Sequence, residues 1–348
     1  MSWRRRVGLL LVALLGAYVL LAPHTEVHER RLVAVADLHG DYAHALAVLR
    51  NAHILAPDST DWVAGDTVLV STGDSVDRGD DTIQLYELYL SLQKQSAAAG
   101  GRVVNLLGNH EMMNALHDWR YVTPGDVRSF GGAAARRHAM SIDGWVGAAW
   151  LDTYNVTATV ELPLPAGLEG ALPKAVQASF VHGGITPAWA KRGVDEINAL
   201  GHTFLQKALA EPDARGGLPT NTTQAEAALW SADGPFWYRG YAVDRAAAAC
   251  ATAREAMHAL GVQYMVMGHT PSLQGFQVRC DGGVYVIDTG ISRAYGGRQS
   301  ALEVATRYER RRVWGRVHHT LAYTFSALYV GAAPQRLHVQ AEHWSDAH

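Results

Sequence analysis

The chain has 348 residues, which is enough for one large domain or two small ones. Apolar residues make up 48% of the sequence, so a sizeable buried core is available. The formal net charge is −3, which gives no general reason to expect a nucleic-acid partner. Cys250 and Cys280 do not have the spacing of a zinc-binding motif, so no structural zinc site is predicted.

The N-terminal residues 1–23 form a segment distinct from the fold. Arginines at positions 4–6 precede an uncharged, mostly aliphatic run over residues 7–22, an order typical of an export signal. The run is slightly shorter than the roughly 20 apolar residues of a membrane-spanning helix, and Pro23 makes a poor cleavage site. A cleaved signal peptide and an uncleaved signal anchor therefore both remain open.

In either case, the positive-inside rule predicts that the folded part lies in the lumen of the secretory pathway, outside the cell or in the periplasm. Residues 7–22 are then a candidate membrane anchor. Such compartments permit disulfides, and a bond between Cys250 and Cys280 is a hypothesis.

The sequence after the polar connector 24–31 alternates between strand and helix. Helices are expected after Asp41, which would cap the first, and from Thr82, which would cap the second, to Leu92. Strands separated by helices predict a parallel sheet with right-handed crossovers. Apolar runs place these strands at residues 32–36, 67–71 and 103–107.

The later sequence predicts an insert and further strands within one domain over residues 32–348. The insert, residues 112–178, is expected to place helices over the site before a strand resumes. The tail from Leu321 onward is expected to form strands that complete a second sheet. Shorter strands are predicted at residues 179–181, 264–267 and 284–288.

Five polar motifs follow directly after apolar, strand-forming runs. Ligand sites in parallel sheets lie outside the carboxyl ends of the strands, so we predict that the motifs form one site. In chain order they are Asp37-Leu38-His39-Gly40-Asp41, Gly73-Asp74-Ser75-Val76-Asp77-Arg78-Gly79, Gly108-Asn109-His110-Glu111, His182-Gly183-Gly184 and Gly268-His269-Thr270.

Carboxylate, imidazole and amide ligands together suit borderline divalent metals, here Mn, Fe or Zn. We predict two divalent ions that share the Asp74 carboxylate. Such a pair would clamp an in-line displacement at phosphorus, with a metal-held hydroxide as the nucleophile. One ion would bind Asp37, His39 and Asp74, and the other would bind Asp74, Asn109, His182 and His269.

Side chains beside these ligands have predicted catalytic roles. His110, held by Asp77, would protonate the leaving group. Arg78 would bind the phosphoryl oxygens. Arg239 is a second candidate for the phosphate, with a surface ion pair or an aromatic stack as the alternative. Glu111 is predicted to support the ligands rather than to bind metal.

The order of these motifs resembles that of the calcineurin-like metallophosphoesterases. Val76-Asp77-Arg78-Gly79 is similar to the phosphoprotein phosphatase branch, whose members remove phosphate from proteins. The resemblance covers residues 32–297. It is narrowed to the Shewanella-like protein phosphatases by Gly268-His269-Thr270, Ile287-Asp288-Thr289-Gly290-Ile291-Ser292 and Tyr295-Gly296-Gly297.

This resemblance implies an α/β fold, a two-sheet sandwich flanked by helices. It also implies a phosphate-binding arginine pair, Arg78 and Arg239, and places Tyr295 in a loop that lines the catalytic groove. Ala36 stands where the pattern usually has glycine. The insert after Glu111 is unlike that of the eukaryotic serine/threonine enzymes, so their regulatory subunits are not carried over.

The predicted function is a metal-dependent phosphomonoesterase that acts on phosphoproteins or phosphopeptides and favours phosphotyrosine. The Shewanella-like phosphatases include tyrosine-directed enzymes, and Trp119, Tyr121 and Phe130 would wall a deep pocket. The alternative role for these aromatic residues, favoured for most of them, is to pack the insert against the sheet. Two alternatives remain open: an enzyme for nucleotides or other small phosphoesters, and a catalytically dead binding protein on the same fold. The sequence does not specify the metal or the oligomeric state.

Overall fold

The computed structural model describes residues 24–165, 168, 175–211, 216–313 and 316–346. The strands are β1 (His24–Val35), β2 (Val68–Ser71), β3 (Arg102–Leu106), β4 (Tyr154–Asn155), β5 (Thr157–Glu161), β6 (Gln177–Val181), β7 (Tyr264–Met267), β8 (Gln277–Arg279), β9 (Val284–Val286), β10 (Ser300–Val313), β11 (Arg316–Tyr329) and β12 (Gln335–Ser345). The helices are α2 (Tyr42–Asn51), α3 (Thr82–Ala98), α4 (Asn109–Ala115), α5 (Pro124–Ser129), α6 (Ala133–Ala139), α7 (Trp145–Thr153), α8 (Pro187–Ala190), α9 (Val194–Ala210), α10 (Gln224–Leu229), α11 (Gly240–Val243) and α12 (Ala246–Leu260).

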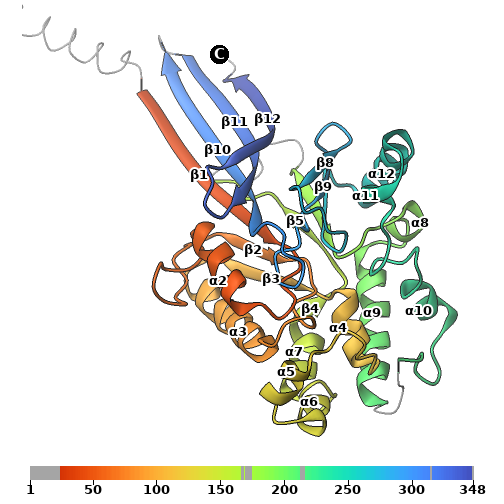
Figure 1. Ribbon diagram of the computed structural model, residues 1–348. Coiled ribbons are helices and arrows are strands. Elements are labelled where there is room, and N and C mark those ends of the chain that lie inside the picture. Colours follow the sequence, from red (N-terminus) through yellow and green to blue (C-terminus); the bar gives the residue numbers. More distant parts are fainter. Residues whose placement is uncertain (1–23, 166–167, 169–174, 212–215, 314–315, 347–348) are drawn as a thin grey trace, which may run out of the picture.

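The strands form two sheets with helices on both outer faces, as predicted (Figure 1). The first sheet has the order β12-β11-β10-β1-β2-β3-β4, and the second has the order β5-β6-β7-β9-β8. Successive side chains of β1 point to opposite faces. Leu32 and Ala34 pack against the second sheet, whereas Val33 and Val35 pack against α2 and α3. The layers are therefore helix, sheet, sheet and helix.

The predicted parallel core of the first sheet is confirmed. β1 pairs in parallel with β2, and β2 pairs in parallel with β3. The Asp41 carboxylate caps α2 by accepting a hydrogen bond from the backbone N–H of His44. The three strands therefore end at one edge of the sheet, and that edge carries the first three motifs.

The second helix differs from its predicted bounds. Asp81 occupies the N-cap position of α3, so Thr82 is the first helical residue and not the cap. The helix also continues past Leu92 to Ala98, because its buried face extends as far as Ser96. The predicted cap at Thr82 and the predicted end at Leu92 are therefore wrong, although the helix itself is confirmed.

Two predictions about the ends of the fold are also wrong. Residues 24–31 are not a connector, because β1 begins at His24 and pairs antiparallel with β10, from His24 opposite Arg312 to Ala34 opposite Leu302. The tail strands β10, β11 and β12 extend the first sheet rather than completing the second. Of these, β10 pairs with the backbone groups that β1 would otherwise expose at the edge of the parallel core. These strands project from the body as a long ribbon in Figure 1.

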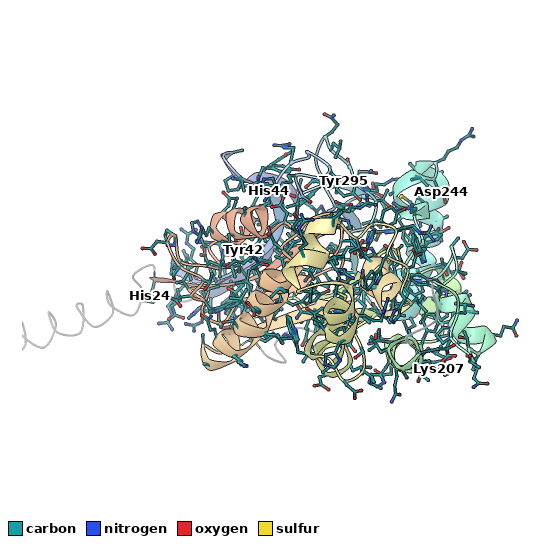
Figure 2. All side chains as sticks on the ribbon, turned by 60° about the horizontal axis from the view of Figure 1, so that its bottom comes forward. His24, Tyr42, His44, Lys207, Asp244 and Tyr295 are labelled. Atoms are coloured by element: carbon teal, nitrogen blue, oxygen red, sulfur yellow. A yellow bond between two sulfur atoms is a disulfide. The ribbon has the colours of Figure 1, made fainter. Side chains whose placement is uncertain are left out.

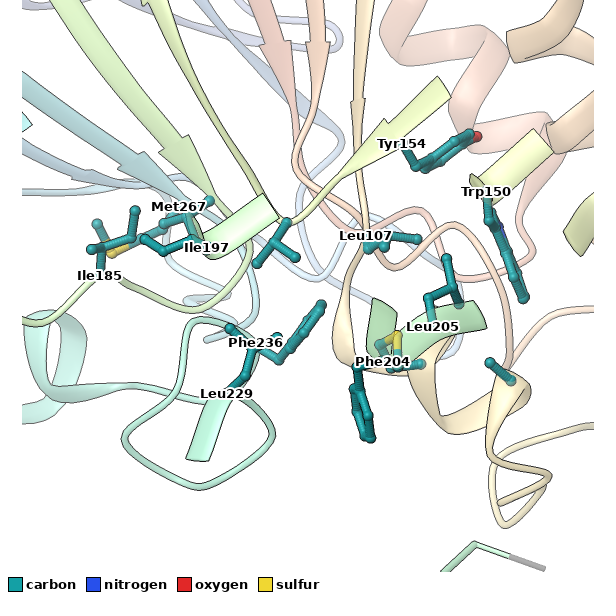
Figure 3. Close-up of a cluster of buried hydrophobic side chains, with 14 of the residues drawn as sticks. Leu107, Trp150, Tyr154, Ile185, Ile197, Phe204, Leu205, Leu229, Phe236 and Met267 are labelled. Carbon is teal, nitrogen blue, oxygen red and sulfur yellow. The ribbon is translucent and has the colours of Figure 1, made fainter. Parts of the chain in front are cut away.

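Helices that follow β6 cover the outer face of the second sheet, whereas α7 of the insert packs on α9 and on β4 of the first sheet. The insert contains α5, α6 and α7 before β4 and β5, so the prediction of helices followed by a strand is confirmed. Trp150 of α7 and Phe204 of α9 lie in one buried cluster with Met112 and Leu116, from α4 and its C-terminus (Figure 3). This cluster fixes α4, which begins at Asn109 in the third motif.

Cys250 and Cys280 form a disulfide that joins α12 to the residue after β8. None of the helices in the described residues is long and apolar enough to cross a membrane. The predicted signal peptide or anchor, residues 1–23, lies outside the described residues.

Candidate metal centre

The loops that carry the five motifs meet between the two sheets. Asp37, Asp74 and Asn109 follow β1, β2 and β3, whereas His182 and His269 follow β6 and β7. All five side chains are buried. The fold therefore brings to one place residues that are far apart in the sequence.

The backbone adopts a strained conformation at several site residues. His39, Asp74, Asp77, Arg78 and His269 have φ values of 44°, 54°, 69°, 64° and 67°. Non-glycine residues seldom adopt this left-handed region, and each instance costs on the order of 1 kcal/mol or more. Five of the ten non-glycine residues with positive φ in the described part of the chain lie in these motifs, so the surrounding structure has to offset strain in these loops.

Close backbone contacts hold the second and third motifs together. A Cβ atom on Gly73 would lie 2.4 Å from the backbone nitrogen of Gly108, so this approach requires glycine. The Glu111 carboxylate accepts hydrogen bonds from the backbone N–H groups of Gly108 (2.8 Å), Asp74 (2.9 Å) and Ser75 (2.8 Å). Glu111 therefore joins the two loops and supports the ligands, as predicted.

The Asp74 carboxylate lies at the centre of the cluster. Its Oδ2 atom is 3.2 Å from Nε2 of His182, 3.7 Å from that of His39 and 3.9 Å from that of His110. Two groups of side chains that could hold a metal ion share this carboxylate. One group is His39, Asp74 and His110, and the other is Asp74, His182 and His269.

The two remaining predicted ligands lie next to these groups. Oδ2 of Asp37 is 4.0 Å from Nε2 of His39, and the Asp37 carboxylate accepts a hydrogen bond from the backbone N–H of His269. Oδ1 of Asn109 is 2.8 Å from Nε2 of His182. All six predicted ligands are therefore gathered in one buried cluster.

The imidazole orientations fit metal binding. Nδ1 of His39 lies 3.0 Å from the Val76 carbonyl oxygen, and Nδ1 of His182 lies 2.9 Å from that of Thr72. Each contact leaves Nε2 facing the cluster, which is the usual arrangement around a bound metal. Nε2 of His269 is buried without a hydrogen-bond partner in the described part of the chain. A buried nitrogen without a partner is costly, and a metal ion would satisfy it.

The charges of the cluster also fit divalent cations. Burial and the neighbouring Asp288 raise the pKa of Asp37, and burial raises the pKa of Asp288 to about 6. Burial would also raise the pKa of Asp74, but the charges of His182 and His110 hold it well below the usual range. Against the effect of burial, Asp74 and Asp37 raise the pKa of His182 to about 9. Bound cations would compensate this concentrated negative charge.

His110 is held by a buried network that reaches into the insert. Its Nδ1 atom lies 2.6 Å from Oδ2 of Asp77, the contact predicted from the sequence. Asn114 donates a hydrogen bond to Oδ1 of Asp77 at 2.9 Å and accepts one from Nη1 of Arg136 at 2.7 Å. Arg136 is fully buried and also donates to Asp126. The insert therefore fixes the orientation of the proposed acid.

The electrostatic surroundings of His110 favour its protonated form. Burial by itself would lower the pKa of His110, but the Asp74 charge and the hydrogen bond to Asp77 raise it above its ordinary value. Because Nδ1 contacts Asp77, Nε2 is the atom available to the pocket. This nitrogen could protonate a leaving group or bind metal, and the two roles are separable by experiment.

A pocket of about 70 Å³ opens over the cluster. The Arg78 guanidinium lies between the rings of Tyr121 and Tyr295, at 4.3 Å and 4.9 Å from their centroids. Arg239 donates a hydrogen bond to the carbonyl oxygen of His269 at 2.8 Å. Both arginines and Tyr295 line the pocket, so the predicted phosphate-binding residues are brought to the cluster.

The predicted aromatic walls are only partly present. Tyr121 lines the pocket, but Trp119 and Phe130 pack on the Arg136 guanidinium, at 4.8 Å and 5.7 Å. Trp237, which the sequence did not single out as a pocket residue, lines it instead. The wall role of Trp119 and Phe130 is therefore wrong, because a buried arginine in the insert takes their ring faces.

Asn114 and Arg136 of this network were not predicted from the sequence. Asn114 lies one helical turn after His110, so the spacing of four residues was a usable signal. Arg136 had no such signal, because its contact with Asn114 depends on how α6 packs against α4. Asp41 was explained as a helix cap, but its carboxylate also binds Arg293 through hydrogen bonds of 2.7 to 3.0 Å.

Comparison with known proteins identifies the family. The model of the calcineurin-like phosphoesterase family matches residues 30–273. The chain belongs to the calcineurin-like phosphoesterase family. It is also 38% identical over 275 residues to an uncharacterized protein of Schizosaccharomyces pombe, a match that covers 78% of this chain and 76% of that protein. As a member of this family, the chain is a phosphoester hydrolase.

More distant relatives agree with the predicted branch. Shewanella-like protein phosphatase 2 of Arabidopsis thaliana is 25% identical over 320 residues, covering 79% of this chain and 75% of that protein. The crystal structure of a cold-active protein-tyrosine phosphatase from a psychrophilic Shewanella species superposes with a TM-score of 0.65 at 23% identity, covering 89% of this chain and 80% of that one. The resemblance to Shewanella-like phosphatases and the two-sheet fold are confirmed.

The position of Asp74 predicts a test of metal sharing. Asp74→Asn removes the charge that faces both groups, so we expect loss of most bound metal and of nearly all activity. Elemental analysis of purified protein measures the metal directly. Asp58→Asn, at an exposed aspartate, is the matched control and should retain the metal of the parent. Two ions still bound to the Asp74→Asn protein would contradict the shared role.

The contacts of His110 predict a second test. His110→Asn should keep the metals but slow turnover of alkyl phosphates by roughly 10²- to 10⁴-fold, the usual contribution of a general acid. The loss should be smaller for p-nitrophenyl phosphate, because its leaving group needs little protonation. An equal loss for both substrates would contradict the acid role, and loss of metal in this variant would indicate that His110 is a ligand.

Proposed function

We propose that this hydrolase is a two-metal phosphomonoesterase that removes phosphate from phosphoproteins and favours phosphotyrosine. The observation that carries the proposal is the buried Asp74 carboxylate, which faces imidazoles of both ligand groups beneath a pocket lined by two arginines. The six proposed ligands are Asp37, His39, Asp74, Asn109, His182 and His269.

The bound ions would supply Lewis acidity toward the phosphoryl oxygens and would lower the pKa of a coordinated water. The residues of the chain orient the substrate around them. Arg78, fixed between two aromatic rings, presents its guanidinium for bidentate contact with phosphoryl oxygens. Arg239 approaches from the His269 side of the pocket, so the two arginines would hold the phosphoryl group in place.

His110 would deliver the proton that the leaving oxygen requires. Asp77 holds Nδ1, so the proton at Nε2 faces the pocket. Asn114 and Arg136 hold Asp77 in turn, which limits the movement of the imidazole. This arrangement would favour departure of an alkoxide or phenoxide that becomes neutral as it leaves.

The preference for phosphotyrosine is supported by the surroundings of the phosphate site. The ligands are buried, whereas the polypeptide of a substrate has to stay at the surface. A phenyl ring holds phosphorus farther from the peptide backbone than a serine side chain does. Tyr121, Trp237 and Tyr295 line the pocket and offer ring contacts to a phenyl group. The protein-tyrosine phosphatase activity in the name of the Shewanella structure agrees with this preference.

Matched phosphopeptides test the substrate class. We expect kcat/KM for a phosphotyrosine peptide to exceed that for the same peptide with phosphoserine by at least about tenfold, which corresponds to about 1.4 kcal/mol in the transition state. Nucleotides and other small phosphoesters are compared in the same assay. Equal values for the two peptides would contradict the tyrosine preference, and preferred hydrolysis of nucleotides would replace the phosphoprotein assignment.

We also propose that the folded part is exported from the cytosol, with residues 7–22 as its signal or anchor. The basic and apolar order of the first residues supports export, and so does the Cys250–Cys280 disulfide, because such bonds persist in oxidising compartments. A redox-sensitive fluorescent protein fused to the C-terminus should report an oxidising environment. A reduced, cytosolic signal would contradict the proposal.

A further inference from the structure

A groove of about 710 Å³ lies beside the metal pocket. Tyr121, Trp237 and Arg239 line both, so the groove adjoins the pocket. A substrate fixed by its phosphoryl group and leaving the pocket on this side would pass over these shared residues. The groove is therefore placed to contact the part of a substrate that surrounds the phosphorylated residue.

The walls of the groove are aromatic and well anchored. The ring centroids of Trp230 and Trp237 are 5.2 Å apart in an edge-to-face contact. Tyr238 makes a similar contact with Tyr241, whose hydroxyl donates to the Ile185 carbonyl oxygen at 2.7 Å. A wall that is already ordered loses little conformational entropy when a ligand binds.

The acidic end of the groove is fixed as well. The Arg279 guanidinium donates hydrogen bonds to the backbone carbonyl oxygens of Tyr241 and Asp244. Arg279 precedes Cys280, which is tied by the disulfide to Cys250 of α12. The position of Asp244 therefore depends on elements far from it in the sequence. Asp244 lies at the surface in Figure 2.

Three aspartates and two arginines line the groove, so its negative side chains outnumber its positive ones. Asp118 forms an ion pair with Arg120, and Arg239 is engaged with the loop of His269 at the pocket. Asp233 and Asp244 are exposed, and neither side chain has an ion pair or a hydrogen bond in the described part of the chain. The groove beyond Arg239 is therefore negative and offers two unpaired carboxylates.

Both of these carboxylates lie near the same aromatic ring. Burial raises the pKa of the Tyr238 hydroxyl, and the charges of Asp244 and Asp233 raise it further. A lysine or arginine side chain fits such surroundings, because its methylene groups pack on aromatic rings while its charge pairs with carboxylates. An acidic side chain would meet like charge there.

We propose that this groove binds the polypeptide of the substrate, and that Asp233 and Asp244 select a basic residue next to the phosphorylated one. The proposal rests on the phosphoprotein phosphatase function proposed above and adds a sequence preference to it. The phosphate site binds the phosphoryl group, and the two carboxylates bind the neighbouring basic side chain. Because both aspartates are exposed, their contribution to the binding free energy of the substrate is modest and decreases as the salt concentration rises.

The test compares phosphotyrosine peptides that differ only at the residues flanking the phosphotyrosine, which are arginine, alanine or glutamate. In the full-length protein we expect kcat/KM for the arginine peptide to exceed that for the glutamate peptide by roughly tenfold, mainly through KM. The ratio should fall as ionic strength rises, because exposed charges are screened.

Variants of the two aspartates connect the preference to the groove. In the double variant Asp233→Asn, Asp244→Asn the ratio of arginine to glutamate peptide should fall to about one. In Asp233→Lys, Asp244→Lys it should invert. Asp58→Asn, which removes one negative charge from an exposed site on another loop, should keep the ratio of the parent. Each ratio is measured within one protein, so differences in folding or metal content cancel.

The outcomes separate this proposal from the function on which it rests. Peptides that are hydrolysed with the same ratio in the parent and the double variant would overturn the groove proposal while leaving the phosphatase function intact. A preference of the parent for glutamate would overturn it as well. Hydrolysis of p-nitrophenyl phosphate without hydrolysis of any peptide would contradict both the phosphoprotein function and the groove.

Discussion

The buried Asp74 carboxylate and the imidazoles around it impose the main constraint on this fold. Charged and polar groups are expensive to bury unless they are paired or bind a cation. Here the proposed ligands come from the ends of β1, β2, β3, β6 and β7, so both sheets have to be complete before the cluster exists. The site is thus a property of the two-sheet arrangement and not of any single motif.

The local cost of this arrangement is visible in the backbone. His39, Asp74 and His269 have positive φ values, and Gly73 meets Gly108 at a distance that no side chain permits. Such strain persists because the surrounding structure determines the loops from several sides. Glu111 provides one of these restraints through three backbone hydrogen bonds, and the buried clusters on either side of the sheets provide the rest.

The sequence predicted the site more completely than the fold around it. The proposed ligands lie in short motifs directly after strands, so local patterns and the rule for parallel sheets were sufficient to predict that they lie together. The network of Asn114 and Arg136 depends on packing between α4 and α6, which no local pattern encodes. The same holds for the ends of the first sheet. Residues 24–31 are mostly polar, and the strand that they form pairs with β10, near the other end of the described chain. The tail strands β11 and β12 join the first sheet only through β10.

The central claim is that two metal ions share Asp74. The most direct measurement is a crystal structure of the metal-loaded protein with anomalous scattering recorded at the absorption edge of each bound metal. The account predicts two ions roughly 3.5–4 Å apart, with oxygens of the Asp74 carboxylate about 2.0–2.2 Å from each. A single ion, or two ions of which only one contacts Asp74, would contradict it.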